Sequence, residues 1–297
     1  MPMPSSDRVG ASLADGWREA VPAAWLAGWE PIRFELEGGT TEVVVSGEGP
    51  TLLLLPSLPG HKETWLRVLP LLARRHRVVT ADLRVRFDAA PGWGTLIADL
   101  ERVSHAYAPE PAVVVGHSLG GGLAQRWALA HPERVSALVL SSSFARVGGG
   151  RGAFLKRWVE QPLVLATQRW LPPAAGLAVA RAGVANGWWV YDPCCDDAVL
   201  GLVRHAVSGL PLADALAMVR LAFAHDLRAD LTRIAVPTLV TVGTRETAWM
   251  WTAAAELAAR IPHAERRALE GVGHLHPLSA PDRLADTVED WLARLGP

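Results

Sequence analysis

The feature that most constrains this chain is the stretch Gly116–Gly120, which reads Gly-His-Ser-Leu-Gly. A short apolar run, Ala112–Val115, precedes it, and a helical pattern over Gly121–His131, ended by Pro132, follows it. A strand, a tight turn and a helix around a G-x-S-x-G pattern lift a serine hydroxyl out of a sheet. The two glycines are expected where a side chain would collide with the neighbouring strand or helix. The alternative, a glycine- and serine-rich loop without chemistry, is disfavoured by this context.

Apolar runs alternate with helical patterns along much of the chain. Strands are expected at Pro31–Glu37, Thr41–Ser46, Thr51–Leu55, Arg77–Ala81, Val135–Ser141, Val236–Val242 and Ala264–Leu269. Helices are expected at residues 12–29, broken by Pro22, and at Glu63–Arg74, Leu96–Tyr107, Trp249–Arg260 and Asp282–Leu295. The first two strands are joined at Gly38-Gly39, which indicates a hairpin. The alternation predicts an α/β fold with a mostly parallel central sheet and helices on both faces.

The alternation stops between residues 144 and 227. This interval offers amphipathic segments instead of buried strands, at Phe154–Gln168, Ala174–Asn186, Asp196–Ser208 and Leu212–Ala224. A connection of this length needs structure of its own. We therefore expect a core of residues 1–143 and 228–297, with residues 144–227 forming a helical cap over the carboxyl edge of the sheet.

Composition excludes several classes of partner. The net charge is -1, which gives no reason to expect nucleic acid or a membrane surface as a partner. The two cysteines, Cys194 and Cys195, are adjacent and show no metal-ligand spacing, so they indicate no metal site. No apolar stretch approaches the roughly 18 residues of a spanning helix, and the N-terminal segment is polar, so a cytoplasmic location is expected. The oligomeric state is left open.

A serine hydroxyl needs a base within hydrogen-bonding reach, and the base needs an orienting acid. The glycine-flanked His274 follows the last expected strand and is the best candidate for the base, with His276 as its rival. Glu246 follows the preceding strand and is the candidate acid, unless it is a solvated carboxylate paired with Arg245. Asp226 and Asp230 stand before that strand and are less well placed.

Together these motifs resemble the α/β-hydrolase superfamily, in particular its members with a helical cap. The resemblance covers the chain from Thr41 onward and depends on Gly116–Gly121, on Val236–Val240 with Gly243 and Glu246, and on Gly271–His274. It implies a Ser118-His274-Glu246 triad, although the family more often uses Asp as the acid. The serine argues against the relatives that use Asp as nucleophile.

Two segments depart from the family pattern. Pro56-Ser57 stands where the family usually has His-Gly, in the loop that supplies one oxyanion-hole N–H. The expected donors are the backbone amides of Leu58 and Leu119, with Pro59 restricting Leu58 to extended backbone. The segment Asp82–Asp88 has lost the glycines of the family's turn, so either a surface turn or a pocket position for Phe87 or Asp88 is expected.

The resemblance implies a serine hydrolase that cleaves a carboxylic ester or related acyl bond through an acyl-enzyme. A small or medium-sized hydrophobic acyl or aromatic substrate is expected, with no cofactor or metal, in a pocket lined by His117, Trp158, Trp188 and Phe87, unless the tryptophans only pack cap against core. One alternative is a C–C bond hydrolase or a lyase or cyclase of secondary metabolism on the same fold. Another is a non-catalytic ligand-binding member.

Overall fold

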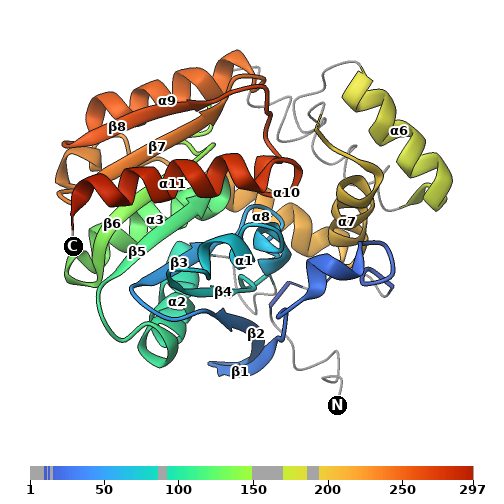
Figure 1. Ribbon diagram of the computed structural model, residues 1–297, viewed down its shortest axis with the longest axis horizontal. Coiled ribbons are helices and arrows are strands. Elements are labelled where there is room, and N and C mark those ends of the chain that lie inside the picture. The colour runs from blue at the N-terminus through green and yellow to red at the C-terminus, as the bar shows by residue number, and fades with distance from the viewer. Residues whose placement is uncertain are drawn as a thin grey trace.

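The computed structural model describes residues 10–11, 13, 16–85, 92–148, 170–185 and 194–296. These residues form one eight-stranded sheet with the strand order β1-β2-β4-β3-β5-β6-β7-β8 (Figure 1). The strands β1 and β2 form an antiparallel hairpin, β2 pairs antiparallel with β4, and all other pairs are parallel. Their bounds are β1 (Ile32–Leu36), β2 (Gly39–Ser46), β3 (Thr51–Leu55), β4 (Arg77–Ala81), β5 (Ala112–His117), β6 (Val135–Ser141), β7 (Thr238–Gly243) and β8 (Ala264–Leu269).

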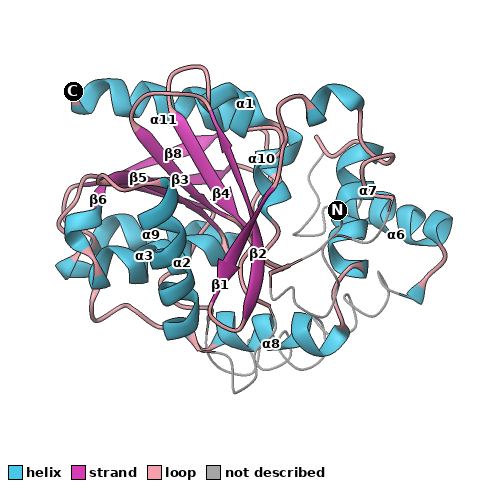
Figure 2. Cartoon of the chain, turned by 90° about the horizontal axis from the view of Figure 1, so that it is seen from below, coloured by secondary structure: helices cyan, strands magenta, loops and turns pink. Residues whose placement is uncertain are grey.

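Helices cover both faces of this sheet, as the sequence predicts. In Figure 2, α1 (Leu69–Leu72) and α11 (Pro281–Leu295) lie on one side, and α2 (Trp93–Tyr107), α3 (Leu119–Ala130) and α9 (Ala248–Arg260) lie on the other. The remaining described helices are α6 (Pro173–Ala185), α7 (Asp197–Ser208), α8 (Leu212–Phe223) and the short α10 (His276–Ser279). Single 3₁₀ turns are η1 (Ala23–Leu26), η2 (Lys62–Trp65), η3 (Pro132–Arg134) and η5 (Leu231–Arg233).

The central strand β3 shows why the apolar runs identify the sheet. Its leucines are almost completely buried on both sides, because Leu52 and Leu54 enter one hydrophobic cluster while Leu53 and Leu55 enter the other. A strand covered by helices on both faces needs apolar side chains at consecutive positions. The predicted bounds of β3, β4 and β6 match the observed ones for this reason.

Two expected helices are wrong. The described part of residues 12–29 contains turns and η1 instead of a long helix, and residues 63–74 are divided between η2 and α1. Each break coincides with a proline: Pro22 precedes η1, and Pro70 lies in the first turn of α1. Proline lacks an N–H and is tolerated only where a helix begins, so each proline starts a new element.

Helices α6, α7 and α8 all come from the interval between β6 and β7. Helix α7 buries Val199, Leu200 and Leu202 in the same cluster as Trp29 and Trp65. The expected helix at residues 154–168 lies outside the described residues, and the division into core and cap stays a prediction. No single described helix is long and apolar enough to cross a membrane, although α7 and α8 reach that length and composition as a pair bent by 101°.

Candidate active site

The turn between β5 and α3 holds Ser118 in an unusual backbone conformation, with φ 53° and ψ −115°. Two close approaches make this turn possible. A β-carbon at Gly116 would lie 2.4 Å from the Gly120 carbonyl oxygen, and one at Gly120 would lie 2.1 Å from the Leu55 carbonyl oxygen. A side chain at either position would therefore collide with the neighbouring helix or strand, as the sequence predicts.

The structure brings Ser118, His274 and Glu246 together at the carboxyl edge of the sheet. His274 lies in the loop between β8 and α10, and its Nε2 is 3.1 Å from Ser118 Oγ. Its Nδ1 is 2.9 Å from Glu246 Oε1. A carboxylate only accepts hydrogen bonds, so Nδ1–H donates to Glu246 and Nε2 is left to accept from the serine hydroxyl.

Glu246 follows β7 and points inward, with its side chain only 1% exposed. Burial by itself would raise the pKa of Glu246. The nearby His274 imidazole and hydrogen bonds from His274 and Ser142 outweigh that effect, and the pKa of Glu246 is lowered. The alternative acids Asp226 and Asp230 form ion pairs with Arg228 and Arg233 at partly exposed positions.

The end of β6 contributes three consecutive serines to this site, which the sequence analysis did not identify. Ser141 Oγ lies 2.7 Å from His276 Nε2, and Ser143 Oγ donates to the Ser118 carbonyl oxygen at 2.9 Å. Ser142 adopts a positive φ of 43° and its hydroxyl faces the Glu246 carboxylate. The sequence signal that indicates them is the Ser-Ser-Ser run that begins at the last residue of β6, the buried strand that pairs with β5.

Two further histidines lie near His274 inside the protein: His117 packs beside the His274 ring, and His276 packs against His117. The His117 ring centroid lies 5.0 Å from those of both His274 and His276, and its Nδ1 lies 3.1 Å from the Ser141 carbonyl oxygen. Burial lowers the pKa of His117 well below its usual value, and the His274 and His276 imidazoles lower it further. His117 is only 1% exposed and packs against the other two rings, and its expected place in the substrate pocket stays a prediction. His276 is held by Ser141 and by the Gly273 carbonyl oxygen instead of facing Ser118.

The two expected oxyanion donors lie on neighbouring segments. Leu119 is the first residue of α3, and the turn before it sits against the end of β3, where Leu55 pairs with Gly116. A β-carbon at Gly120 would come within 2.6 Å of the Pro56 carbonyl oxygen, which shows how closely the two backbones approach. Among the described residues, neither the Leu58 nor the Leu119 amide donates to another backbone carbonyl. The expected pocket residues Phe87, Trp158 and Trp188 lie outside the described residues.

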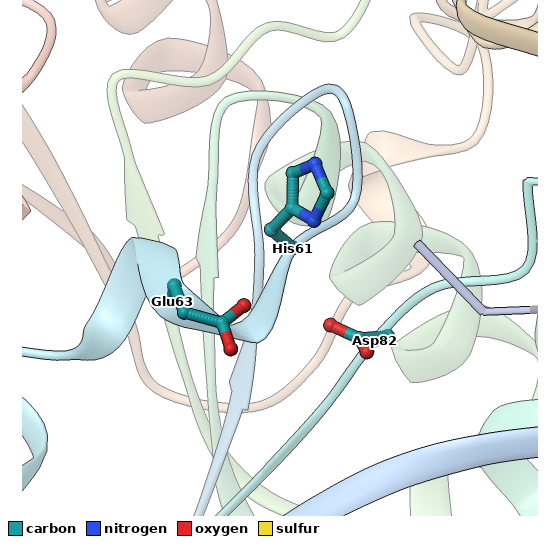
Figure 3. Close-up of side chains that lie close together, drawn as sticks. All are labelled: His61, Glu63 and Asp82. Atoms are coloured by element: carbon teal, nitrogen blue, oxygen red, sulfur yellow. The ribbon is translucent and has the colours of Figure 1, made fainter. Parts of the chain in front are cut away.

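One group of side chains near this loop has the composition of a metal site. His61, Glu63 and Asp82 each offer a ligand atom, and these atoms lie within 4.8 Å of one another. Figure 3 shows the Glu63 and Asp82 carboxylates turned toward each other below the His61 ring. The Lys62 ammonium, however, lies 2.9 Å from Glu63 Oε1 and 3.2 Å from Asp82 Oδ2. A positive charge is already in contact with both carboxylates, so the group does not suit a second cation.

A mostly parallel sheet with a serine on a strand–helix turn and a histidine after the last strand defines the class of α/β-fold hydrolases. Residues 52–287 match the alpha/beta hydrolase family, and the chain belongs to that family. It is 29% identical over 280 residues to the putative carbamate hydrolase RutD of Variovorax paradoxus, covering 89% of this chain and 97% of the relative. It is also 29% identical to the pimeloyl-[acyl-carrier protein] methyl ester esterase of Vibrio atlanticus, covering 75% and 86% of the two chains.

Solved structures show the same fold at lower identity. The enol-lactonase of Burkholderia xenovorans superposes with a TM-score of 0.70 at 24% identity, covering 88% of this chain and all of that one. The meta-cleavage product hydrolase of Pseudomonas fluorescens superposes with a TM-score of 0.71 at 19% identity, covering 89% and 98%. The chain is therefore a hydrolase enzyme of the α/β-hydrolase fold.

Proposed function

We propose that this protein is a serine hydrolase that cleaves carboxylic esters of small, hydrophobic acyl groups. The observation that carries the proposal is the continuous hydrogen-bonded path from Ser118 Oγ through the His274 imidazole to the Glu246 carboxylate. The 3.1 Å between Ser118 Oγ and His274 Nε2 is the distance of a nucleophile in contact with its base, and the 2.9 Å between His274 Nδ1 and Glu246 Oε1 is that of a base held by its acid. Two relatives, a putative carbamate hydrolase and a methyl ester esterase, support acyl chemistry of this kind.

In the proposed reaction, Ser118 Oγ attacks the ester carbonyl carbon while His274 Nε2 takes the hydroxyl proton. Glu246 holds the imidazole in the tautomer that leaves Nε2 free to accept, and it stabilises the imidazolium that forms. The imidazolium then gives its proton to the alkoxide leaving group, which departs and leaves an acyl-serine. Water, deprotonated by His274, attacks the acyl-serine and releases the carboxylic acid.

The negative oxygen of each tetrahedral intermediate needs preorganised donors. The amides of Leu58 and Leu119 are proposed for this role, since neither is used by another backbone carbonyl among the described residues. The helices between β6 and β7 are proposed to form a cap that encloses the acyl group. The cytoplasmic location expected from the composition stays a prediction.

The test combines an active-site label with ester turnover. A fluorophosphonate probe should label the wild-type protein, and p-nitrophenyl esters should be hydrolysed. Ser118→Ala should lose both, with a fall in kcat of roughly 10⁴ or more. Ser136→Ala is the matched control, because Ser136 is an exposed residue of β6. This variant should be labelled by the probe and should hydrolyse the esters like the wild-type protein.

Two other outcomes would replace the proposal. Labelling at Ser118 without turnover of any ester would favour a C–C bond hydrolase, lyase or cyclase that uses the same serine. Absence of both labelling and turnover in the wild-type protein would favour a ligand-binding member of the family.

A further inference from the structure

A buried lysine holds the segment that follows the proposed oxyanion loop. Lys62 is the first residue of η2 and is 1% exposed. Its ammonium lies 2.8 Å from Glu42 Oε2 on β2, 2.9 Å from Glu63 Oε1 and 3.2 Å from Asp82 Oδ2 just after β4. Its backbone N–H donates to the other oxygen of Asp82 at 3.0 Å. We call these four side chains the Lys62 anchor.

The Lys62 anchor is a group of buried charges that depend on one another. One ammonium faces three carboxyl groups, which would leave an excess of negative charge if all were ionised. Burial raises the pKa of Glu63, the Lys62 charge opposes this, and the Asp82 charge raises the pKa further; the net direction is upward. A buried lysine in this setting is rigid, because moving it would leave several buried charges uncompensated.

The loop between β3 and the Lys62 anchor is closed by its own hydrogen bonds. The Gly60 amide donates to the Ser57 carbonyl oxygen at 2.7 Å, and the Gly60 carbonyl accepts from the Leu83 amide at 2.8 Å. The hydroxyls of Ser57 and Thr64 lie 3.2 Å apart and share a hydrogen bond. Leu58 lies inside this closed loop, so a shift of either end would move its amide.

The same loop is attached to the helical interval between β6 and β7. The side chain of His61, which is 3% exposed, places Nε2 2.8 Å from the Ala206 carbonyl oxygen of α7. A carbonyl oxygen only accepts, so Nε2–H of His61 is the donor. His61 directly precedes Lys62, and it therefore joins α7 to the end of the loop that the Lys62 anchor fixes to the sheet.

We propose that His61 is a positioning residue that makes the oxyanion hole depend on the position of α7. The Lys62 anchor ties the carboxyl-terminal end of the loop to the sheet, and the hydrogen bond from His61 to Ala206 ties the same end to α7. When α7 is in place, this end of the loop is held by both the sheet and α7, and the Leu58 amide faces the oxyanion. When α7 moves away, the donor is lost and transition-state stabilisation falls. This inference rests on the proposed function, since it gives Leu58 the role of an oxyanion donor.

The test compares His61→Phe, which keeps an aromatic ring but removes the donor, with His61→Gln, which retains an N–H. His61→Phe should lower kcat by about 10- to 100-fold with little change in KM, because a misplaced donor affects mainly the transition state. The affinity for an alkyl trifluoromethyl ketone, whose serine adduct carries an oxyanion, should fall by the same factor. His61→Gln should recover most of both losses. His105→Phe, the same change at an exposed position on α2, is the matched control.

A merely structural role for His61 predicts a different pattern. The proposed coupling of α7 to the oxyanion hole would be overturned if His61→Phe kept the kcat and the ketone affinity of the wild type. Equal losses in His61→Phe and His61→Gln would also overturn it. If His61→Phe does not fold, hydrogen exchange of the wild-type protein decides. Ketone binding should slow amide exchange in both the 57–60 loop and the C-terminal turn of α7, and an unchanged α7 would overturn the link. The Ser118→Ala experiment tests the triad independently, so its result does not depend on whether His61 couples α7 to the oxyanion hole.

Discussion

The two segments that meet at the Ser118 hydroxyl are held in place by opposite means. The turn between β5 and α3 is fixed by uncharged backbone packing, with Gly116 and Gly120 lying where no β-carbon fits. The loop between β3 and η2 is fixed by buried charge, because the Lys62 ammonium contacts one carboxylate on β2, one on η2 and one just after β4. One segment depends on shape and the other on charge.

This difference explains why one segment keeps the family motif while the other departs from it. A turn fixed by shape tolerates no side chain, so its glycines are retained. A loop fixed by buried charges at its end can carry Pro56-Ser57 where the family usually has His-Gly, provided that the charges remain. The predictions below are ways to separate the two kinds of support, in order of decreasing effect.

The largest effect is expected at the base of the triad, where activity and stability should separate. His274→Ala should lower kcat by roughly 10⁴ to 10⁶, because triad members act as a unit. Its free energy of unfolding should fall by only about 1–3 kcal/mol, because the buried Glu246 carboxylate loses its hydrogen-bond donor while the rest of the core is unchanged. Steady-state kinetics and thermal unfolding check this, with His105→Ala as a control at an exposed position. Activity within tenfold of wild type would rule out His274 as the base.

The second effect concerns the segment held by charge. Lys62→Met should lower the free energy of unfolding by about 3–5 kcal/mol, because it leaves buried carboxylates without their cation. Urea unfolding measures this change. The control is Arg181→Met, which breaks an exposed ion pair with Asp197 and should have little effect. Equal stability of the two variants would contradict the role of the Lys62 anchor.

The third effect concerns the segment held by shape. Gly120→Ala should destabilise the protein by about 1–3 kcal/mol or more, because its β-carbon would meet the backbone oxygens of Leu55 and Pro56. Gly94→Ala is the matched control: it lies in α2, nothing stands within 4 Å of the added carbon, and a small gain in stability is expected. A Gly120→Ala protein as stable as wild type would show that the turn is not closely packed.

The smallest effect is a pH dependence at Glu246. Its folded pKa is lowered from the ordinary value of 4.5, so its contribution to stability is present above that value and is lost as the pH falls through the folded pKa. The difference in unfolding free energy between wild type and Glu246→Gln should therefore shrink as acid is added below about pH 4.5. Chemical unfolding of both proteins over this range provides the measurement, and a constant or growing difference would show that the carboxylate is not stabilised in the fold.

Much of the fold could be predicted because its signals are local. The run Thr51–Leu55 is apolar at nearly every position, and proximity to a G-x-S-x-G pattern identifies β5 and α3. The order serine, acid, histidine with glycines around the histidine also selects Ser118, Glu246 and His274, which the structure brings together. The expected helix at residues 63–74 is wrong because Pro70 begins a separate helix, and apolar spacing alone does not indicate that break.

The supporting contacts could not be predicted, because they join residues with no pattern in the sequence. Lys62 finds Glu42 and Asp82, each 20 residues away, only after three strands have paired. His61 reaches Ala206 across 145 residues, and nothing near either residue indicates the other. The place of His117 in a substrate pocket stays a prediction, because alternation along a strand does not say which face of the sheet carries the substrate.

The account depends on Ser118 being a nucleophile activated by His274, and mass spectrometry of the probe adduct tests this most directly. The wild-type protein is incubated with a fluorophosphonate and digested, and the modified residue is identified. The account predicts a single adduct on Ser118 that forms far more slowly in His274→Ala. An adduct on another residue, or equal rates of Ser118 labelling in the wild type and His274→Ala, would contradict it.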